Sequence, residues 1–187
     1  MAYAIMISRR ELIGISGSAL VSSTLAGCLS DSDTVSADLL QIKAITVRWR
    51  HENHSYSDHI LRLFSDGESE ITGLVATEYG NVVSSPVEVT VSDEFHETLE
   101  GEFETVRYAI GVCGDGFSSD ADNHGCLNAP TSREDFNSVQ FGDQSEVEVA
   151  DNHNHIDVQD VKRGDVEDWD TDISEFEWSE RHAEHGQ

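Results

Sequence analysis

Two histidines, two residues apart, are the residues of this sequence whose types and spacing come closest to a chemical site. His153 and His155 lie in the run Asp151-Asn152-His153-Asn154-His155-Ile156-Asp157. On a strand, residues i and i+2 point to the same side of the sheet. Imidazole together with carboxylate is a donor set that first-row metals take. The run therefore predicts a candidate divalent-metal site formed by His153, His155, Asp151 and Asp157.

The apolar pattern on either side of this run indicates a break in the strand. Val147 and Val149 are apolar at odd positions, whereas Ile156 and Val158 are apolar at even positions. The register must shift between them, which predicts a bulge or loop at the histidines, and bulges are common next to sites. A polar, solvated turn without metal is the alternative, and the pattern leaves it open. His51, His54 and His59 form a second group, which we expect near one end of a sheet.

Catalytic motifs are absent from the sequence. It contains no Gly-x-Ser-x-Gly elbow, no phosphate-binding loop and no His-Glu-x-x-His. Acidic pairs are frequent, but in a chain with 37 Asp and Glu residues they carry no information about glycosidase chemistry. We therefore expect a protein that is not an enzyme and has no cofactor apart from the candidate divalent metal.

The N-terminal segment indicates export. Arg9 and Arg10 precede the apolar stretch 12–25, which is diluted by glycine and serine. That stretch is too short for a membrane-spanning helix, which needs ~20 mostly apolar residues. A charged start, a short apolar middle and small residues before a processing point are typical of an export signal.

Two short motifs in this segment resemble those of known exported proteins. Ser8-Arg9-Arg10-Glu11-Leu12-Ile13 resembles the twin-arginine export motif, and Leu25-Ala26-Gly27-Cys28 resembles the lipobox of lipoproteins. The resemblance implies that residues 1–27 are a signal peptide removed after export and that Cys28 carries a lipid. It further implies a protein held on the extracellular face of the cell membrane, with the lipid bilayer as its partner.

The charge balance limits the partners and points to a saline environment. The net charge is −26, and removal of residues 1–27 takes away a net +1 and leaves −27. Such a charge argues against binding to nucleic acid or to anionic lipid heads. Lys43 and Lys162 are the two lysines of the chain, a composition that resembles the acidic, lysine-poor proteins of halophilic archaea. At ~1 M salt the Debye length is ~3 Å, so neighbouring carboxylates scarcely repel.

The two cysteines outside the leader suggest a disulfide. An exported protein works in a compartment that permits disulfides, and twelve residues lie between Cys113 and Cys126. This short, glycine-containing span can close a loop. Two free thiols or two soft metal ligands are the alternatives, but no Cys-x-x-Cys pair supports a metal-thiolate site.

Alternating apolar residues predict a series of short strands. Ile45, Val47 and Trp49 share one face of a first strand, and similar patterns cover 59–64, 71–79, 86–91, 104–113, 139–141, 147–149 and 156–158. Thr131 and Glu134 predict one short helix through a capping box. The fold class that we expect is mainly β, an antiparallel β-sandwich of immunoglobulin-like general character, with one short helix and an acidic C-terminal tail.

The predicted organisation follows from these patterns. Residues 28–40 are a flexible tether, 41–163 the β-sandwich domain and 164–187 an acidic tail with two tryptophans. Because large aromatic residues are usually buried, we expect the tail to dock on the domain; binding of a partner is the alternative. Asn53-His54-Ser55 is a glycosylation sequon in an expected turn.

The function that we expect is a lipid-anchored cell-surface binding or structural module of a halophilic archaeon. Its partner would be a ligand or protein at the cell surface and not a nucleic acid. A metal-binding surface protein that uses His153 and His155 is one alternative. A subunit of a larger membrane assembly is another.

Overall fold

The computed structural model describes residues 34–85, 87–118, 124–150 and 152–187. The predicted signal and anchor, with Arg9, Arg10 and Cys28, therefore lie outside the described residues.

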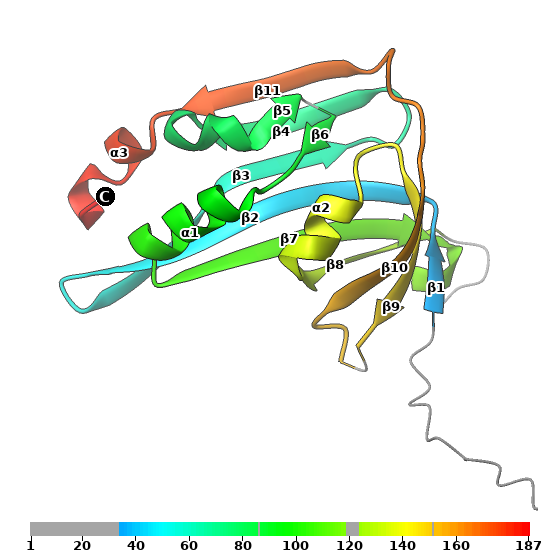
Figure 1. Cartoon of the computed structure of the whole chain (residues 1–187), viewed down its shortest axis with the longest axis horizontal. Helices are drawn as coiled ribbons and strands as arrows, with labels where there is room; N and C mark the ends of the chain where they lie inside the picture. Colours follow the sequence, from blue (N-terminus) through cyan, green and yellow to red (C-terminus); the bar gives the residue numbers. More distant parts are fainter. Residues whose placement is uncertain (1–33, 86, 119–123, 151) are drawn as a thin grey trace, which may run out of the picture. The chain divides into compact units, whose positions relative to one another are not determined.

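Six strands form the larger of two sheets, in the order β11-β4-β3-β2-β7-β8 (Figure 1). Neighbouring strands are antiparallel, except that β11 runs parallel to β4. The strands of this sheet are β2 (Leu39–His51), β3 (His54–Ser65), β4 (Glu70–Ala76), β7 (Thr105–Gly114), β8 (Gly125–Thr131) and β11 (Asp170–Phe176).

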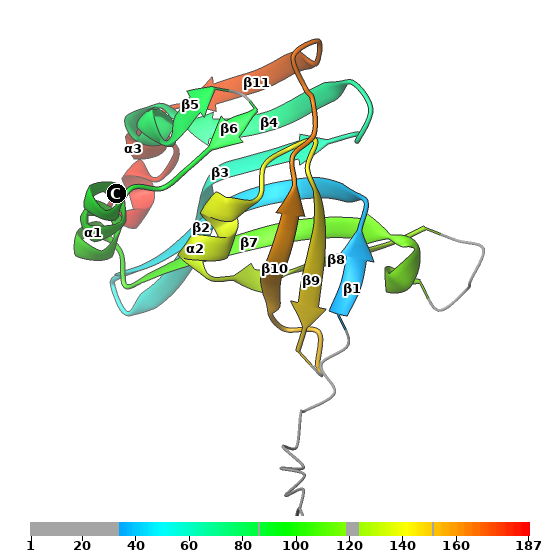
Figure 2. The same cartoon turned by 45° about the vertical axis from the view of Figure 1, so that its right-hand side comes forward.

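Three strands form the second sheet, in the antiparallel order β1-β9-β10 (Figure 2). Its buried residues Val147 and Ile156 join Ile45 and Ile110 of the larger sheet in one hydrophobic core. Two sheets around one core confirm the predicted fold class, a mainly β sandwich. The strands of this sheet are β1 (Thr34–Ala37), β9 (Gln144–Val149) and β10 (Ile156–Lys162); β5 (Val83–Ser85) and β6 (Glu88–Val89) form a separate pair.

The alternation of apolar residues correctly predicted the central strands. Ile45, Val47 and Trp49 are buried on β2. On β7, Tyr108 is buried opposite Ile45, and Ile110 is buried opposite Lys43. The strand expected at 86–91 is wrong in length, because β6 contains only two residues; position 86 itself lies outside the described residues. The strand expected at 139–141 is also wrong: this segment is a turn whose apolar side chains are nevertheless buried.

Helices cover one face of the larger sheet. In Figures 1 and 2, α1 and α2 lie over the same face, and both reach Tyr108. The Nδ1 atom of His96 on α1 lies 2.8 Å from the Tyr108 hydroxyl, and the ring of Phe136 on α2 is 5.3 Å from the Tyr108 ring. The helical segments are η1 (Thr77–Val82), α1 (Asp93–Glu102), η2 (Asp115–Phe117), α2 (Arg133–Ser138), α3 (Trp178–Arg181) and η3 (Ala183–His185).

The predicted helix exists as α2, but its cap was placed one residue too early. Ser132, not Thr131, is the N-cap, and its Oγ accepts a hydrogen bond from the backbone N–H of Asp135 (3.0 Å). Thr131 is the last residue of β8 and donates to the carbonyl of Ile156 (2.7 Å). The Ser-x-x-Asp pair caps the helix by the same physics as the box that we expected from Thr131 and Glu134.

Lys43 is fully buried in the sandwich. Its Nζ donates to three backbone carbonyls, of Val89 (2.9 Å), Phe136 (2.6 Å) and Val139 (2.8 Å), and to Oε1 of Gln140 (3.1 Å). Burial lowers the pKa of Lys43 well below its usual range. The three carbonyls nevertheless require three N–H donors, which only the charged ammonium form of the side chain has. Lys43 therefore ties β2 to β6, α2 and the turn that follows α2.

The predicted tether and tail both turned out to be part of the fold. The tether is wrong from residue 34 onward, because β1 and the start of β2 occupy 34–40. In the tail, β11 pairs with β4 and Trp178 is only 3% exposed. Docking of the tail on the domain, the outcome that we expected, is therefore confirmed. Unfavourable exposure of a large indole explains why an acidic segment packs instead of remaining solvated.

Candidate functional site

A pocket of about 800 Å³ lies between η1, α1 and the C-terminal segment. Its volume is within the range of small-molecule sites, roughly 300–1,000 Å³. The wall combines carboxylates, hydroxyls and aromatic rings. The lining residues are Glu78, Tyr79, Thr90, Ser92, Glu94, Phe95, Thr98, Glu102, Trp178, Ser179 and Gln187.

One face of α1 supplies the acidic side of the pocket. Ser92 is the N-cap, and its Oγ accepts from the backbone N–H of Phe95 (3.1 Å), which fixes where the helix begins. Glu94, Thr98 and Glu102 follow at spacings of four and so lie above one another on one helix face. The helix is held against the sandwich by Leu99, which is fully buried.

Glu78 positions the C-terminal side of the pocket. Its carboxylate accepts from the backbone N–H groups of Trp178 (2.9 Å) and Ser179 (3.0 Å), the first two residues of α3. Burial alone would raise the pKa of Glu78, but these two N–H donors outweigh it and lower the pKa to about 2. A carboxylate at a helix N-terminus satisfies donors that the helix itself leaves unpaired.

Tyr79 fixes a second carboxylate of the wall. Its hydroxyl donates to Oε2 of Glu102 (2.8 Å), and burial together with this carboxylate raises the pKa of Tyr79. The phenol therefore stays protonated at neutral pH and keeps donating to Glu102. Tyr79 also packs against Phe95, with ring centroids 6.2 Å apart, so that one residue orients both a charged and an apolar part of the wall.

Trp178 forms the aromatic floor of the pocket. Its indole meets Trp49, Phe103 and Tyr79 edge-on at centroid distances of 5.4, 5.6 and 5.9 Å. Its Nε1 atom is buried and has no hydrogen-bond partner among the described residues. Buried indole N–H groups normally find an acceptor, so this donor stands out.

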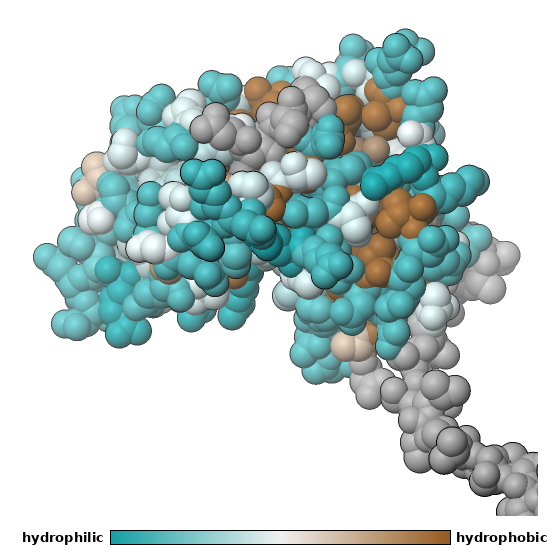
Figure 3. Space-filling view, viewed as in Figure 1, coloured by the Kyte–Doolittle hydropathy of each residue, from teal (hydrophilic) through white to brown (hydrophobic). Residues whose placement is uncertain are grey.

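The charge of the wall favours a cation. Glu78, Glu94 and Glu102 contribute carboxylates, and the described residues that line the pocket include no Lys or Arg. Aromatic rings attract cations through their electron-rich faces. An organic ammonium or guanidinium group thus finds both kinds of partner in this pocket. Figure 3 shows that the surface around the helices in this view is predominantly hydrophilic.

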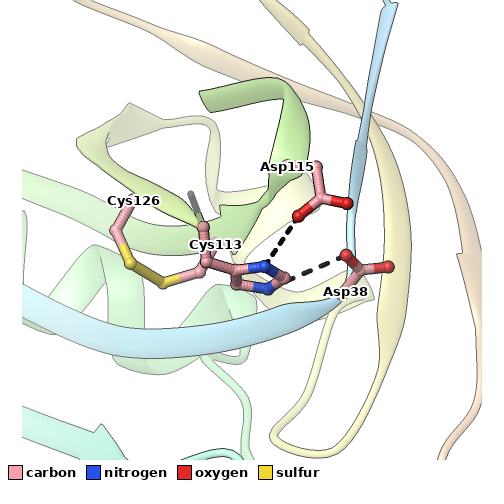
Figure 4. The surroundings of a disulfide bond; sticks show 5 residues. Asp38, Cys113, Asp115 and Cys126 are labelled. Atoms are coloured by element: carbon pink, nitrogen blue, oxygen red, sulfur yellow. Dashed lines mark hydrogen bonds and ion pairs between the residues drawn. A yellow bond between two sulfur atoms is a disulfide. The ribbon is translucent and has the colours of Figure 1, made fainter. Parts of the chain in front are cut away.

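The predicted disulfide is present. Cys113 on β7 lies directly opposite Cys126 on β8, with Cα atoms 4.1 Å apart, and the two are bonded. Figure 4 shows Asp38 and Asp115 beside this disulfide. His124 lies between the two carboxylates, 2.9 Å from Asp115 and 3.8 Å from Asp38. This contact was not predicted, because residue 38 is far from residue 124 in the sequence.

The predicted metal site stays a prediction. His155 Nε2 lies 3.3 Å from Asp157 Oδ1, and His153 has a positive φ of 55° in an exposed turn between β9 and β10. The expected break in the strand register is therefore confirmed as a turn. Asp151 lies outside the described residues, and the described part of the chain holds no group of three His, Cys, Asp or Glu side chains arranged to bind a metal.

Four of the other histidines lie on or against the β2–β3 hairpin. His51 and His54 pair at the end of the β2–β3 hairpin, whose two-residue turn contains Asn53. Asn53 is exposed and has a φ of 65°, which suits an asparagine in such a turn. His59 Nδ1 lies 2.8 Å from the Thr46 hydroxyl, and His185 stacks on Tyr56 at 4.4 Å. Glycosylation of Asn53 stays a prediction.

Sequence reasoning missed the pocket itself. The spacing of Glu94, Thr98 and Glu102 was a helical signal, but nothing in the sequence brings residues 78 and 178 together.

No family model, curated protein or solved structure matches the chain. Among the described residues, no helix is long and apolar enough to span a membrane.

Proposed function

We propose that this chain is a lipid-anchored cell-surface binding module of a halophilic archaeon and that its pocket binds a small organic cation. The observation that carries the proposal of a ligand is the pocket itself, in which carboxylates and aromatic rings meet without a basic side chain among its described lining residues. Cation–π attraction and carboxylate contacts are the usual means by which proteins hold ammonium groups.

The proposal of a lipid anchor is supported by the N-terminal segment. Arg9 and Arg10 followed by Leu25-Ala26-Gly27-Cys28 support twin-arginine export and a lipid on Cys28. The disulfide supports an oxidising compartment. The net charge of −26 supports a saline setting.

Fractionation of expressing cells tests the anchor. Cys28→Ala should still be exported but should leave the membrane for the medium, whereas Arg9→Lys with Arg10→Lys should leave precursor inside the cell. A Cys28→Ala protein that stays as firmly membrane-bound as the wild type would rule out the lipid at this position.

Calorimetry with choline and its neutral isostere 3,3-dimethylbutanol tests the pocket. Choline should bind at least roughly tenfold more tightly, because only the ammonium gains from the carboxylates and rings. Glu102→Gln keeps an acceptor for Tyr79 but removes the charge, so it should weaken choline binding by about tenfold.

Glu97→Gln is the matched control for this experiment. Glu97 is an exposed residue of the same helix that does not line the pocket, so its replacement should leave choline binding unchanged. Equal affinity for choline and for the neutral alcohol, or equal losses in the two variants, would disprove the cation site.

A further inference from the structure

Four arginines share the face of the larger sheet that points away from the core. On β2, Ile45, Val47 and Trp49 point inward, so Arg48 and Arg50 point to the opposite face. The strand register adds Arg62, which lies opposite Ala44, and Arg107, which lies opposite Thr46. All four are exposed. We call this surface the arginine face, defined by Arg48, Arg50, Arg62 and Arg107.

Three of these arginines have no acidic partner in the described part of a chain that contains 37 Asp and Glu residues. Arg50 pairs with Glu104 at 3.4 Å, but Arg48, Arg62 and Arg107 have no carboxylate within 4.0 Å among the described residues. Arginines elsewhere in the described chain do pair, with the following partners: Arg133 with Asp93, Arg163 with Asp143 and Arg181 with Asp58. Among the described residues, arginines without a carboxylate partner therefore occur only on this face.

A small hollow separates two of the unpaired arginines. It measures about 30 Å³ and is lined by Thr46, Val47, Arg48, Ser57, Thr105 and Arg107. Arg48 lies opposite Thr105, and Arg107 lies opposite Thr46, so the two arginines are diagonal neighbours on adjacent strands. Like charges so placed repel each other. Guanidinium groups and hydroxyls around a space of roughly one water volume suit the carboxylate of a single side chain.

An apolar patch adjoins the arginines. Phe64 and Leu74 are 42% and 43% exposed and are the exposed large hydrophobic residues of the described chain. Leu74 on β4 lies opposite Arg62 on β3, and Phe64 follows Arg62 by two residues on β3. Both therefore belong to the arginine face. Arginine beside exposed aromatic and aliphatic groups is typical of protein–protein interfaces.

We propose that the arginine face is a docking site for an acidic segment of a partner polypeptide, with one carboxylate in the hollow between Arg48 and Arg107. An apolar side chain of the same segment packs on Phe64 and Leu74. A second copy of this chain, paired symmetrically through this face, would set arginine against arginine. An anionic bilayer presents an extended negative surface to a chain of net charge −26, whereas a short acidic segment meets only the arginines of this face. The interface is independent of the cation pocket and does not rest on it.

Fluorescence anisotropy with a labelled oligoglutamate peptide that carries one leucine tests the docking site. The protein is the full-length chain with Cys28→Ala, at ~0.5 M sodium chloride, where contact ion pairs persist but long-range attraction is screened. The peptide should bind, and the same peptide with glutamine in place of glutamate should bind at least roughly tenfold more weakly.

Two sets of variants locate the binding. Arg48→Gln with Arg107→Gln should weaken binding of the glutamate peptide by roughly tenfold or more, and Phe64→Ser should weaken it independently. Arg133→Gln removes one positive charge outside this face, so it is the control for the single variants Arg48→Gln and Arg107→Gln, and it should leave binding within about twofold. Because Arg48 and Arg107 are exposed, the melting curve of their double variant should stay close to that of the parent. The side chain of Arg133 is only 28% exposed and pairs with Asp93, so the melting curve of Arg133→Gln is recorded to show that this control is folded at the binding temperature.

Other outcomes overturn the proposal. Failure of the glutamate peptide to bind, or an Arg48/Arg107 double variant that binds like Arg133→Gln, would show that the arginine face is not a docking site for acidic segments. Tighter binding of polygalacturonate or of phosphatidylglycerol vesicles than of the peptide would assign the face to a polysaccharide or a membrane instead. Choline binding should be unchanged in the double variant, so failure here is distinguishable from failure of the pocket.

Discussion

The carboxylate of Glu78 accepts a hydrogen bond from the backbone N–H of Trp178, 100 residues later in the chain, at 2.9 Å. The same carboxylate accepts from Ser179 at 3.0 Å. Glu78 thereby caps α3, for which the N-cap residue Glu177 offers no side-chain hydrogen bond. One residue of η1 thus holds the C-terminal segment in place and sets the position of the indole that floors the pocket.

Replacement of Glu78 by glutamine should loosen this segment. The neutral amide has one oxygen acceptor instead of two, so we expect a loss of about 1 kcal/mol in the free energy of unfolding, the usual value of a helix cap. Tryptophan fluorescence should shift at the same time, because Trp178 becomes more solvated. Urea denaturation measures the first effect. Glu68→Gln, an exposed change in the β3–β4 turn, is the control and should leave both readings unchanged.

The same variant should alter the acid sensitivity of the protein. The pKa of Glu78 is lowered from 4.5 to about 2, so the unfolded state binds more protons between these values. The stabilisation is full above pH 4.5 and is lost as pH falls towards 2. Glu78→Gln should therefore lose less stability than the parent over this pH range. An identical pH dependence of the two melting temperatures would contradict the capping role.

Lys43 should be far more sensitive to substitution than the other lysine. Lys43→Met removes the donor of three buried carbonyls, and buried acceptors without a partner cost about 1–3 kcal/mol each, reduced where neighbours rearrange. We expect about 3 kcal/mol less stability in urea denaturation. Lys162→Met, at an exposed site, should change stability by less than about 0.5 kcal/mol. Equal effects would disprove the buried ammonium.

The central strands could be predicted from the sequence because one of their faces is buried. The alternation of Ile45, Val47 and Trp49 identified β2. The same parity places Lys43 on the inner face, but a charged side chain is not expected there, so its burial was not predicted. The parity also places Arg48 and Arg50 outward. Which residues of other strands join them depends on register, and β2 has irregular pairing with both neighbours, so Arg62 and Arg107 could not be added from sequence.

The pocket could not be predicted for a related reason. Its parts come from η1, α1 and α3, and the contact between Glu78 and Trp178 has no local signature. The tryptophans of residues 164–187 predicted that this acidic segment docks on the domain, but not where: β11 and the indole of Trp178 bury its apolar surface, and the position of that contact has no signal in the sequence. Tertiary packing here overrides local composition.

The disulfide between Cys113 and Cys126 should stabilise the domain. In the chain-entropy model, a loop of this length contributes ~3 kcal/mol. Urea denaturation with and without reductant should differ by about this amount, and Cys113→Ser with Cys126→Ser should remove the difference. Quantitative alkylation of both thiols without reductant would show that the bond does not form in the isolated protein.

Stability should rise with salt. A net charge of −26 makes the compact state repel itself, and added ions screen that repulsion. The melting temperature should therefore be several degrees higher at ~2 M than at ~0.1 M sodium chloride. A midpoint that does not change between these concentrations would argue against an origin in a saline environment.

The most direct test of the binding function is a two-dimensional ¹H–¹⁵N spectrum of the full-length chain with Cys28→Ala during titration with choline. The chain has three tryptophans, so their indole N–H signals are easily resolved. The signal of Trp178 and the backbone signals of Thr98 and Glu102 should move in a saturable way, while the indole of Trp169, which does not line the pocket, should stay in place. A spectrum in which none of the pocket signals moves, or in which the shifts lie elsewhere, would contradict the assignment of this pocket as the ligand site.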